Sequence, residues 1–277
     1  MREAPDPHAL LKWYIEVGAD EAMAEDPLDR FRAPVERPAA SGVAGGAAPS
    51  APAGRSPDRT LPTSGPRLVP AAPPGRIAPP DVAVADTRAL AASCMDLAAL
   101  RAAMENFEGS SLRETATRLV FADGNPAAPL MLIGEAPGAD EDRQGKPFVG
   151  QSGQLLDRML GAIGRDRTSV YIANVVPWRP PGNRKPMPAE ISLLLPFLER
   201  HIELAAPRVL LMVGAVAAGA LLGTTEGITR TRGRWFDWRG IPALATYHPA
   251  YLLRQPAAKR EVWRDFLDLA SRLDSIP

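Results

Sequence analysis

Short runs of large apolar side chains recur in the last two thirds of the chain and indicate buried β-strands. Three of these runs occupy Leu130–Ile133, Ser169–Val176 and Val209–Val213, each bounded by glycine, proline or polar residues. Two further strands are expected at Trp235–Trp238 and Ala243–Thr246. This part of the chain therefore supplies the strands of a sheet.

The segments between these runs carry apolar residues at helical spacing. Helices are predicted at Thr87–Glu105, Gly153–Ile163, Ala189–Ala205, Ala215–Leu221 and Lys259–Leu273. Strands that alternate with helices favour parallel pairing, with helices on both faces of the sheet. We therefore predict an α/β fold, a three-layer α/β/α sandwich with a central, mostly parallel sheet. Ligands of such sheets bind at the carboxyl ends of the strands.

The first third of the chain has a different character. A helix with one apolar stripe is predicted within residues 1–26. Residues 27–85 are predicted to form a disordered linker, because 13 of the 30 prolines lie between Pro27 and Pro80 among alanine, glycine and serine. The folded domain is placed at residues 86–277. The N-terminal helix is either a surface helix of that domain or a tethered helix that docks on a protein partner.

The 277 residues carry no net formal charge, since 32 basic side chains balance 32 acidic ones. The balance is uneven along the chain. Residues 1–30 hold eight acidic and three basic side chains, whereas residues 226–260 hold seven basic and two acidic ones. A basic stretch of this kind can lie along a phosphate backbone, so overall neutrality does not exclude a nucleic acid partner.

A single cysteine, Cys94, excludes internal disulfide bonds and every metal site built from several thiolates. The most apolar stretch, Val209–Leu222, is shorter than the roughly 20 residues that span a bilayer. The first residues lack the pattern of a secretory signal. We expect a soluble, cytoplasmic monomer that binds neither a membrane nor a metal ion.

The first strand end that carries unusual residues is the glycine-rich segment after Leu130–Ile133. Gly134 permits a tight turn or the close approach of a ligand, and the carboxylate of Glu135 follows at the rim of the sheet. An acidic surface loop would give the same pattern. A phosphate-binding loop is disfavoured, because the segment lacks the lysine and hydroxyl pair of such loops and is rich in carboxylates.

The second strand end holds Asn174. An amide in an apolar strand must find hydrogen-bond partners, and it offers both the donor and the acceptor needed to read the edge of a nucleobase. A turn-capping asparagine is the alternative. Arg179 and Arg184 in the following loop can contact phosphates.

The third strand end leads into His248, which is followed by a proline and a run of bulky apolar residues. A lone histidine is often structural. Here, however, the loop also contains Tyr251, Leu252 and Leu253 beside Arg254, which suits a wedge that enters a DNA base stack.

Four segments at these strand ends resemble motifs of the family-4 uracil-DNA glycosylases in order and spacing. They read GEAPGADED, GKPFVGQSGQLLD, NVVPWRPPGNR and YHPAYLLR, and the resemblance extends from about Leu97 to Leu273. It implies the α/β sandwich of the uracil-DNA glycosylase superfamily for residues 86–277. It also implies a DNA repair enzyme that flips uracil out of DNA and hydrolyses the N-glycosidic bond, leaving an abasic site. A monofunctional enzyme is favoured over one with lyase activity, because these motifs place no lysine to form a Schiff base.

The resemblance further implies roles for individual residues. Glu135 matches the acidic residue that positions the hydrolytic water, and His248 matches the histidine that stabilises negative charge on uracil O2. Phe148 matches the aromatic residue that stacks on uracil, and Asn174 the amide that binds its edge, with Gly134 and Ala136 against the substrate. The stretch that matches the DNA-inserting loop contains Pro249, Ala250, Tyr251, Leu252, Leu253 and Arg254.

The chain departs from the family at its iron–sulfur cluster. The four cysteines that hold the cluster in the family match Phe107, Ser110, Trp178 and Leu194 here. We therefore expect no cluster and no other cofactor, with apolar side chains filling the space. Two alternatives stay open: a DNA-binding relative without catalysis that acts in a repair complex, and a glycosylase for another deaminated base such as hypoxanthine or xanthine.

Overall fold

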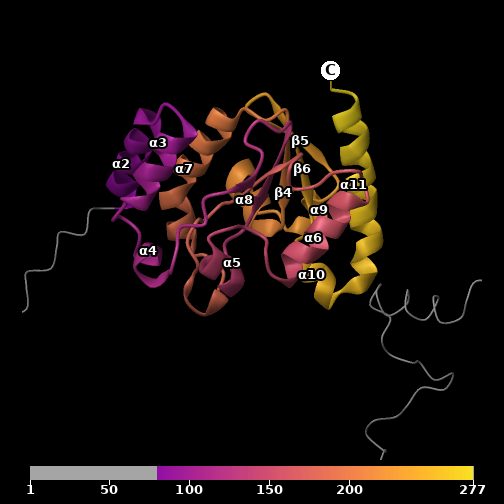
Figure 1. Cartoon of the computed structure of the whole chain (residues 1–277), viewed down its shortest axis with the longest axis horizontal. Helices are drawn as coiled ribbons and strands as arrows, with labels where there is room; N and C mark the ends of the chain where they lie inside the picture. Colours follow the sequence, from indigo (N-terminus) through magenta and orange to yellow (C-terminus); the bar gives the residue numbers. More distant parts are fainter. Residues whose placement is uncertain (1–79, 277) are drawn as a thin grey trace, which may run out of the picture. The chain divides into compact units, whose positions relative to one another are not determined.

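The computed structural model describes residues 80–276 (Figure 1). Its centre is a six-stranded sheet in the order β1-β3-β2-β4-β6-β5, in which the four central strands are parallel and both edge strands are antiparallel. This confirms the predicted mostly parallel sheet. The strands are β1 Asp123–Gly124, β2 Leu130–Gly134, β3 Tyr171–Asn174, β4 Val209–Val213, β5 Trp235–Trp238 and β6 Ile241–Thr246.

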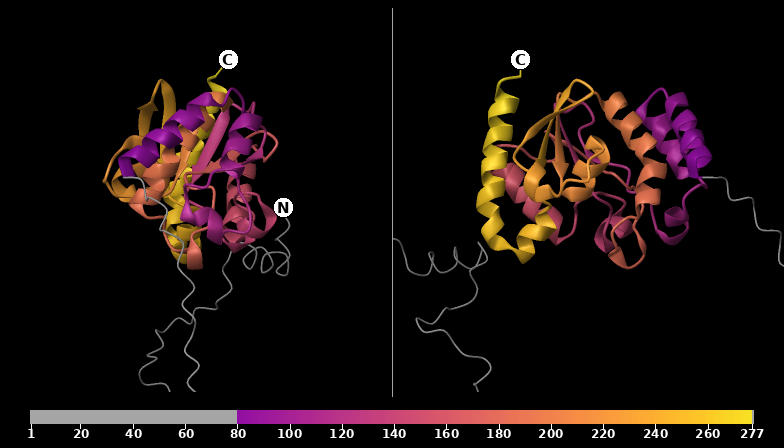
Figure 2. Two further views of the ribbon diagram at one scale, coloured as in Figure 1. Left: turned by 90° about the vertical axis from the view of Figure 1, so that its left-hand side faces the viewer. Right: turned by 180° about the vertical axis from the view of Figure 1, so that it is seen from behind.

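Helices cover both faces of this sheet, which confirms the three predicted layers (Figure 2). Helices α7 and α8 pack on one face, with α2 and α3 outside α7, whereas α6, α10 and α11 pack on the other. No helix within residues 80–276 is long and apolar enough to cross a membrane. The helices are α2 Pro80–Ser93, α3 Leu97–Glu105, α4 Ser111–Thr115, α5 Ala139–Gln144, α6 Gln151–Gly161, α7 Pro188–Ala205, α8 Ala215–Leu222, α9 Ile228–Thr231, α10 Pro249–Arg254 and α11 Lys259–Asp274, with 3₁₀ turns η1 Pro181–Asn183 and η2 Pro256–Ala258.

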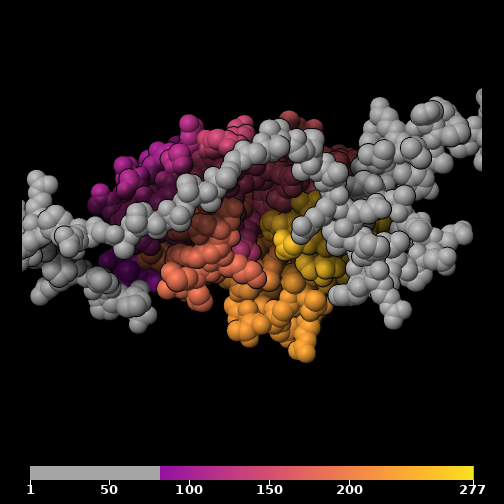
Figure 3. All heavy atoms as spheres, turned by 90° about the horizontal axis from the view of Figure 1, so that it is seen from below, coloured from indigo at the N-terminus to yellow at the C-terminus, as the bar shows by residue number. Residues whose placement is uncertain are grey.

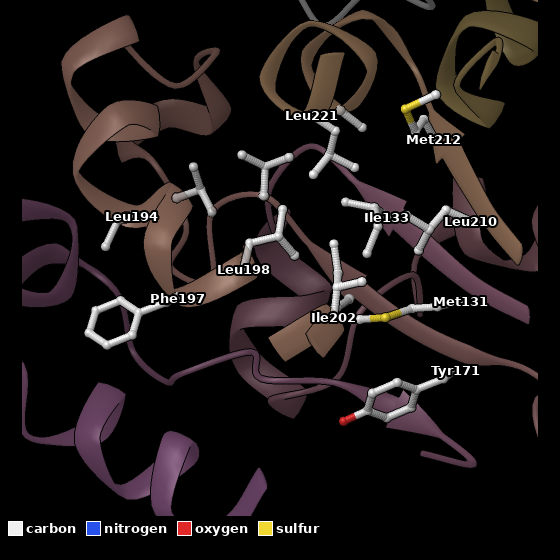
Figure 4. Close-up of a cluster of buried hydrophobic side chains, with 14 of the residues drawn as sticks. Met131, Ile133, Tyr171, Leu194, Phe197, Leu198, Ile202, Leu210, Met212 and Leu221 are labelled. Atoms are coloured by element: carbon white, nitrogen blue, oxygen red, sulfur yellow. The ribbon is translucent and has the colours of Figure 1, made fainter. Parts of the chain in front are cut away.

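The central strands are apolar on both sides because both of their faces are buried. Figure 4 shows the side chains on the α7 face, where Met131 and Ile133 of β2 and Leu210 and Met212 of β4 lie opposite Leu198 and its neighbours on α7. The alternate residues of the same strands point to the other face and pack against α6 and α11. The strands therefore provide a rigid floor, and the polar residues that follow them are held at its edge.

The N-terminal part of the described domain differs from the prediction. The segment Thr87–Glu105, predicted as one helix, is broken into α2 and α3, because the Asp96 carboxylate accepts a hydrogen bond from Ala99 N at 2.7 Å and caps a new helix. Helix α2 begins at Pro80, so residues 80–85, assigned above to the linker, are helical. Proline suits the first turn of a helix, where its missing N–H is not needed. The predicted N-terminal helix and the rest of the linker lie outside the described residues.

The stretch from Pro249 to Arg254, predicted as a loop, forms helix α10. Pro249 stands at the first helical position, and His248 caps the helix because its Nδ1 accepts a hydrogen bond from Ala250 N at 3.1 Å. The proline that indicated a loop in the sequence therefore starts a helix, and it fixes the residues after His248 in one orientation.

Candidate active site

The carboxyl ends of β2, β3 and β6 meet at one edge of the sheet, where the structure forms a cleft of about 190 Å³. Figure 3 views the molecule from the side to which these strand ends point. Three polar residues singled out in the sequence, Glu135, Asn174 and His248, line this same cleft together with Phe148. The complete lining is Glu135, Ala136, Pro137, Gly138, Glu141, Phe148, Ser152, Asn174, Pro180, Asn183, Arg184 and His248.

Gly134 lies beneath the cleft, and because it has no side chain it leaves room for Asn174 and Phe148. It is the register partner of Asn174 across the β2–β3 pair. A Cβ atom at this position would lie 2.3 Å from Asn174 Oδ1 and 2.5 Å from Cε2 of Phe148. Any side chain here would displace the amide or the aromatic ring, so the glycine is required by space.

Asn174 is buried at the end of β3, and its Oδ1 accepts no hydrogen bond from the residues that the structure describes. A buried polar atom without a partner costs about 1–3 kcal/mol relative to a satisfied one. A ligand that donates a hydrogen bond in the cleft would remove this cost. The unpaired oxygen therefore marks a binding position for a donor.

Phe148 is buried and forms an aromatic wall of the cleft. Its backbone is left-handed, with φ of 53°, which is rare for a bulky residue. The ring is stacked on the His248 ring, with 5.4 Å between the centroids and 25° between the planes. Gly153 of α6 permits this backbone path, because a Cβ there would lie 1.8 Å from the Phe148 carbonyl oxygen. The aromatic wall thus depends on an unusual local conformation.

His248 presents a neutral ring to the cleft. Because its Nδ1 accepts a hydrogen bond from Ala250 N, the proton of the neutral ring resides on Nε2. Burial lowers the pKa of His248 to about 4, and the positive charge of Arg254 acts in the same direction, whereas Glu141 opposes it. At neutral pH the ring is therefore an uncharged hydrogen-bond donor.

Glu135 follows β2 at the rim of the cleft and is half-buried. Burial raises the pKa of its carboxyl, and the positive charge of Lys185 partly offsets that increase. The carboxylate therefore stands in a partly dry environment and has a cation nearby that favours its ionised form. This combination suits a group that handles a proton or a developing positive charge.

Glu141 was not among the candidate residues, yet it joins two walls of the cleft. Its buried carboxylate accepts hydrogen bonds from Gly138 N at 3.1 Å and from both Val149 N and Gly150 N at 2.9 Å. These bonds connect the turn after Glu135 with the segment that carries Phe148. The available signal was a glutamate three residues after Gly138, the residue before α5, because a glutamate at this position can accept a hydrogen bond from the backbone N–H of the capping residue.

The two arginines after β3 that were predicted to contact DNA have protein partners. Arg184 lines the cleft and forms a twofold ion pair with the buried Glu190, at 2.8 and 2.5 Å. Arg179 donates from Nε to Asn183 Oδ1 at 2.7 Å and is absent from the lining. Both side chains therefore shape the loop around η1, and much of the charge of Arg184 is neutralised by Glu190.

Helix α10 divides the predicted apolar wedge into buried and exposed residues. Leu252 is 1% exposed and packs with α6 and α11, whereas Tyr251 is 36% and Leu253 42% exposed. Of the three bulky residues, only Tyr251 and Leu253 therefore reach the surface. None of Pro249, Ala250 or Arg254 lines the cleft itself.

The residues at the four positions of the cluster cysteines do not fit an iron–sulfur cluster. Trp178 and Leu194 are buried in the hydrophobic core on the α7 face, and Phe107 packs against the same core with its ring edge-on to Phe197, 5.1 Å between the centroids. Ser110 is buried, and Cys94 directly follows α2 and is buried in the same hydrophobic core as Trp178 and Leu194. Within residues 80–276 no group of three or more histidine, cysteine, aspartate and glutamate side chains is placed to hold a metal ion.

Comparisons with known proteins agree with the resemblance noted in the sequence. Residues 121–267 match the Uracil DNA glycosylase superfamily. A type-4 uracil-DNA glycosylase of Archaeoglobus fulgidus is 39% identical over 163 residues, which cover 56% of this chain and 82% of the relative. Type-4 uracil-DNA glycosylases of Thermotoga maritima, 42% identical over 50% of this chain and 73% of the relative, and of Pyrobaculum aerophilum, 36% identical over 62% and 91%, are also similar.

Proposed function

The chain belongs to the uracil-DNA glycosylase superfamily, and we propose that it removes uracil from DNA by hydrolysing the N-glycosidic bond, which leaves an abasic site. One observation carries the proposal: Glu135, Phe148, Asn174 and His248, from separate parts of the chain, line a single small cleft. Because a base inside a duplex cannot reach such a cleft, the target nucleotide must be flipped out, at a cost of a few kcal/mol.

The cleft suits uracil through its hydrogen-bond pattern. Uracil presents an N3–H donor between two carbonyl oxygens, and in this proposal the unpaired Oδ1 of Asn174 accepts a hydrogen bond from that donor. Cytosine has an acceptor at N3, which would face Oδ1 without a hydrogen and leave both atoms unsatisfied. Stacking on Phe148 adds binding that is tolerant of base identity. Selection of uracil over cytosine would therefore depend on the Asn174 amide, and the affinity for the base would depend largely on the Phe148 ring.

Bond cleavage leaves positive charge on the deoxyribose and negative charge on the departing base. In the proposed reaction, Nε2–H of the neutral His248 donates to uracil O2 and stabilises the negative charge without transferring a proton. The carboxylate of Glu135 stabilises the positive charge, orients the attacking water and accepts its proton as the water oxygen bonds to C1′, while uracil leaves as the anion and takes a proton from the solvent. Lys185 favours the ionised form of Glu135 that both tasks require.

DNA contacts are proposed for α10 and the loop around η1. Leu253 and Tyr251, exposed on α10, would fill the space that the flipped base leaves, whereas the buried Leu252 anchors the helix. Arg254 and Arg179 would contact phosphates on either side. Arg184, paired with Glu190, would instead keep the cleft wall in place.

We further propose that the enzyme works without the iron–sulfur cluster of the family. The support is the donor set, because the whole sequence contains one cysteine and the four matching positions hold phenylalanine, serine, tryptophan and leucine. Three of these side chains pack in the core on the α7 face, so the volume is occupied. None of the steps above involves this region.

The direct test is release of the base from an oligonucleotide that contains one uracil, followed by hot alkali to cleave abasic sites. Strand cleavage with uracil, and little with cytosine, would support the proposal. Oligonucleotides that contain hypoxanthine or xanthine in place of uracil show whether the enzyme acts on another deaminated base. No cleavage with any of these bases would refute the enzymatic function and favour a DNA-binding relative.

A further inference from the structure

Arg167, in the loop between α6 and β3, reaches the aromatic wall of the cleft from behind. It does not line the cleft. Its Nη1 donates to the carbonyl oxygen of Pro147 at 3.1 Å, and its Nη2 donates to that of Phe148. One guanidinium thus holds two successive backbone carbonyls at the residue whose backbone is left-handed.

The guanidinium is itself held by two carboxylates. Asp123 of β1 accepts from Nη1 at 2.7 Å, and Asp157 of α6 accepts from Nε at 2.9 Å. Only 24% of the Arg167 side chain is exposed. Ion pairs on both sides and partial burial restrict this arginine to one orientation, with its remaining donors directed at the segment before α6.

The loop that carries Arg167 is fixed as well. Asp166 accepts hydrogen bonds from Thr168 N and Ser169 N, both at 3.0 Å, and from the Thr168 hydroxyl at 2.7 Å. These bonds form a tight turn that contains the arginine. The Arg167 side chain therefore projects from a rigid base and cannot follow Phe148 if that residue changes conformation.

A left-handed phenylalanine costs about 1–2 kcal/mol relative to an ordinary backbone conformation. Without the two hydrogen bonds, the Phe148 backbone would relax and carry the ring away from His248 and Gly134. From this geometry we infer that Arg167 is a positioning residue, which acts through Phe148 to keep the aromatic wall in the orientation that stacks on the flipped base. The inference rests on the proposed function, since the base is the ligand that the wall would meet.

Two experiments test this inference, and one does not need activity. Protein labelled with 4-fluorophenylalanine contains seven fluorine sites, and the Phe148 signal is assigned with Phe148→Leu. We expect Arg167→Gln to shift this signal and leave the other six in place. The matched control is Arg165→Gln, two residues earlier in the same loop, whose guanidinium makes an exposed ion pair with Asp274 at 3.4 Å. An unchanged Phe148 signal in Arg167→Gln would overturn the inference.

The second experiment is a double-mutant cycle on single-turnover uracil release. Arg167→Gln is expected to lower the rate about tenfold to 100-fold, and Arg165→Gln to leave it unchanged. In a Phe148→Leu background, Arg167→Gln is expected to change the rate less than about threefold, because the ring through which it acts is gone. Arg167→Lys, which keeps the charge but lacks the planar fork, should recover only part of the rate.

If the effects of Arg167→Gln and Phe148→Leu on the rate of uracil release were fully additive, Arg167 would act through another residue and the inference would be wrong. A wild-type rate in Arg167→Lys would also contradict the inference. If the wild-type protein released no base at all, the proposed function would fail, and the fluorine signals would still decide whether Arg167 positions Phe148.

Discussion

The segment from Asn174 to Leu194 contributes to two regions with opposite chemistry. At the sheet edge, Asn174 carries an unpaired oxygen into a cleft lined by a carboxylate and an imidazole. Four residues later, Trp178 enters an apolar region with Leu194 and Phe107, in which no buried side-chain nitrogen or oxygen lacks a partner among the described residues. The region around Asn174 is therefore arranged to bind a ligand, whereas the side chains around Trp178 only pack against one another.

This difference implies that the reaction and its structural support can change independently. The cleft retains every residue type that the family resemblance implies for uracil removal, whereas the apolar region retains none of the cysteines. Well-packed apolar side chains can take over a supporting role, because packing requires volume and shape rather than a particular functional group. If the two regions are as independent as the geometry indicates, a substitution in one should leave the property that depends on the other unchanged.

Glu135→Gln should have the largest effect on the reaction. The amide keeps the size of the side chain but cannot stabilise positive charge or accept a proton, so the single-turnover rate of uracil release should fall about 1,000-fold. The thermal unfolding temperature should stay close to that of the wild type, because the carboxyl is half-buried at the rim. A rate within tenfold of wild type would remove Glu135 from the chemistry.

Leu194→Ala should have the largest effect on stability and little effect on the reaction. Leu194 is fully buried beside Phe197, so truncation should lower the free energy of unfolding by about 3 kcal/mol. At a temperature well below unfolding, the rate of uracil release should stay within twofold of wild type. Leu267→Ala, at an exposed position on α11, is the control and should change neither quantity. A large loss of rate in folded Leu194→Ala protein would show that the two regions are coupled.

Asn174→Ala should weaken selection of the base more than it weakens the chemistry. Removing the amide leaves the N3–H of uracil without its acceptor, which should lower the rate of release at low substrate concentration about 30-fold, or about 2 kcal/mol. The discrimination between uracil and cytosine should fall as well, and this is measured with matched oligonucleotides. Unchanged discrimination would place the reading of the base edge on another residue.

Lys185→Met should have the smallest effect, a displacement of the acid side of the pH–rate profile. Burial raises the pKa of Glu135, and the loss of rate on acidification should follow protonation of this carboxylate. Because the Lys185 charge lowers that pKa, its removal should move the fall in rate to higher pH. His248, with a pKa of about 4, stays neutral over most of this range. A shift to lower pH, or none, would contradict the assignment of Glu135.

The sequence predicted the fold and most of the cleft because both depend on local patterns. Strands β2 and β4 appear as short apolar runs, and Glu135 and His248 lie within two residues of the end of a strand, where parallel sheets bind ligands. The wedge was only partly predicted, since the burial of Leu252 depends on the helical turn that Pro249 begins.

Other features of the cleft depend on contacts between distant parts of the chain. Arg167 is 44 residues from Asp123 and 19 from Phe148, and no local pattern links them. The left-handed backbone of Phe148 could not be predicted from the sequence either, because a bulky residue rarely adopts this conformation and only the surrounding hydrogen bonds impose it. The contacts that hold the cleft walls together are therefore visible only in the structure.

We propose that this chain hydrolyses uracil from DNA in a polar cleft that is supported by apolar packing rather than by a metal cluster. The most direct measurement determines iron content, visible absorbance and uracil release on one purified sample. We predict uracil release by protein that contains no stoichiometric iron and shows no visible absorbance band. Release that depends on bound iron, or no release by folded protein, would show that this proposal is wrong.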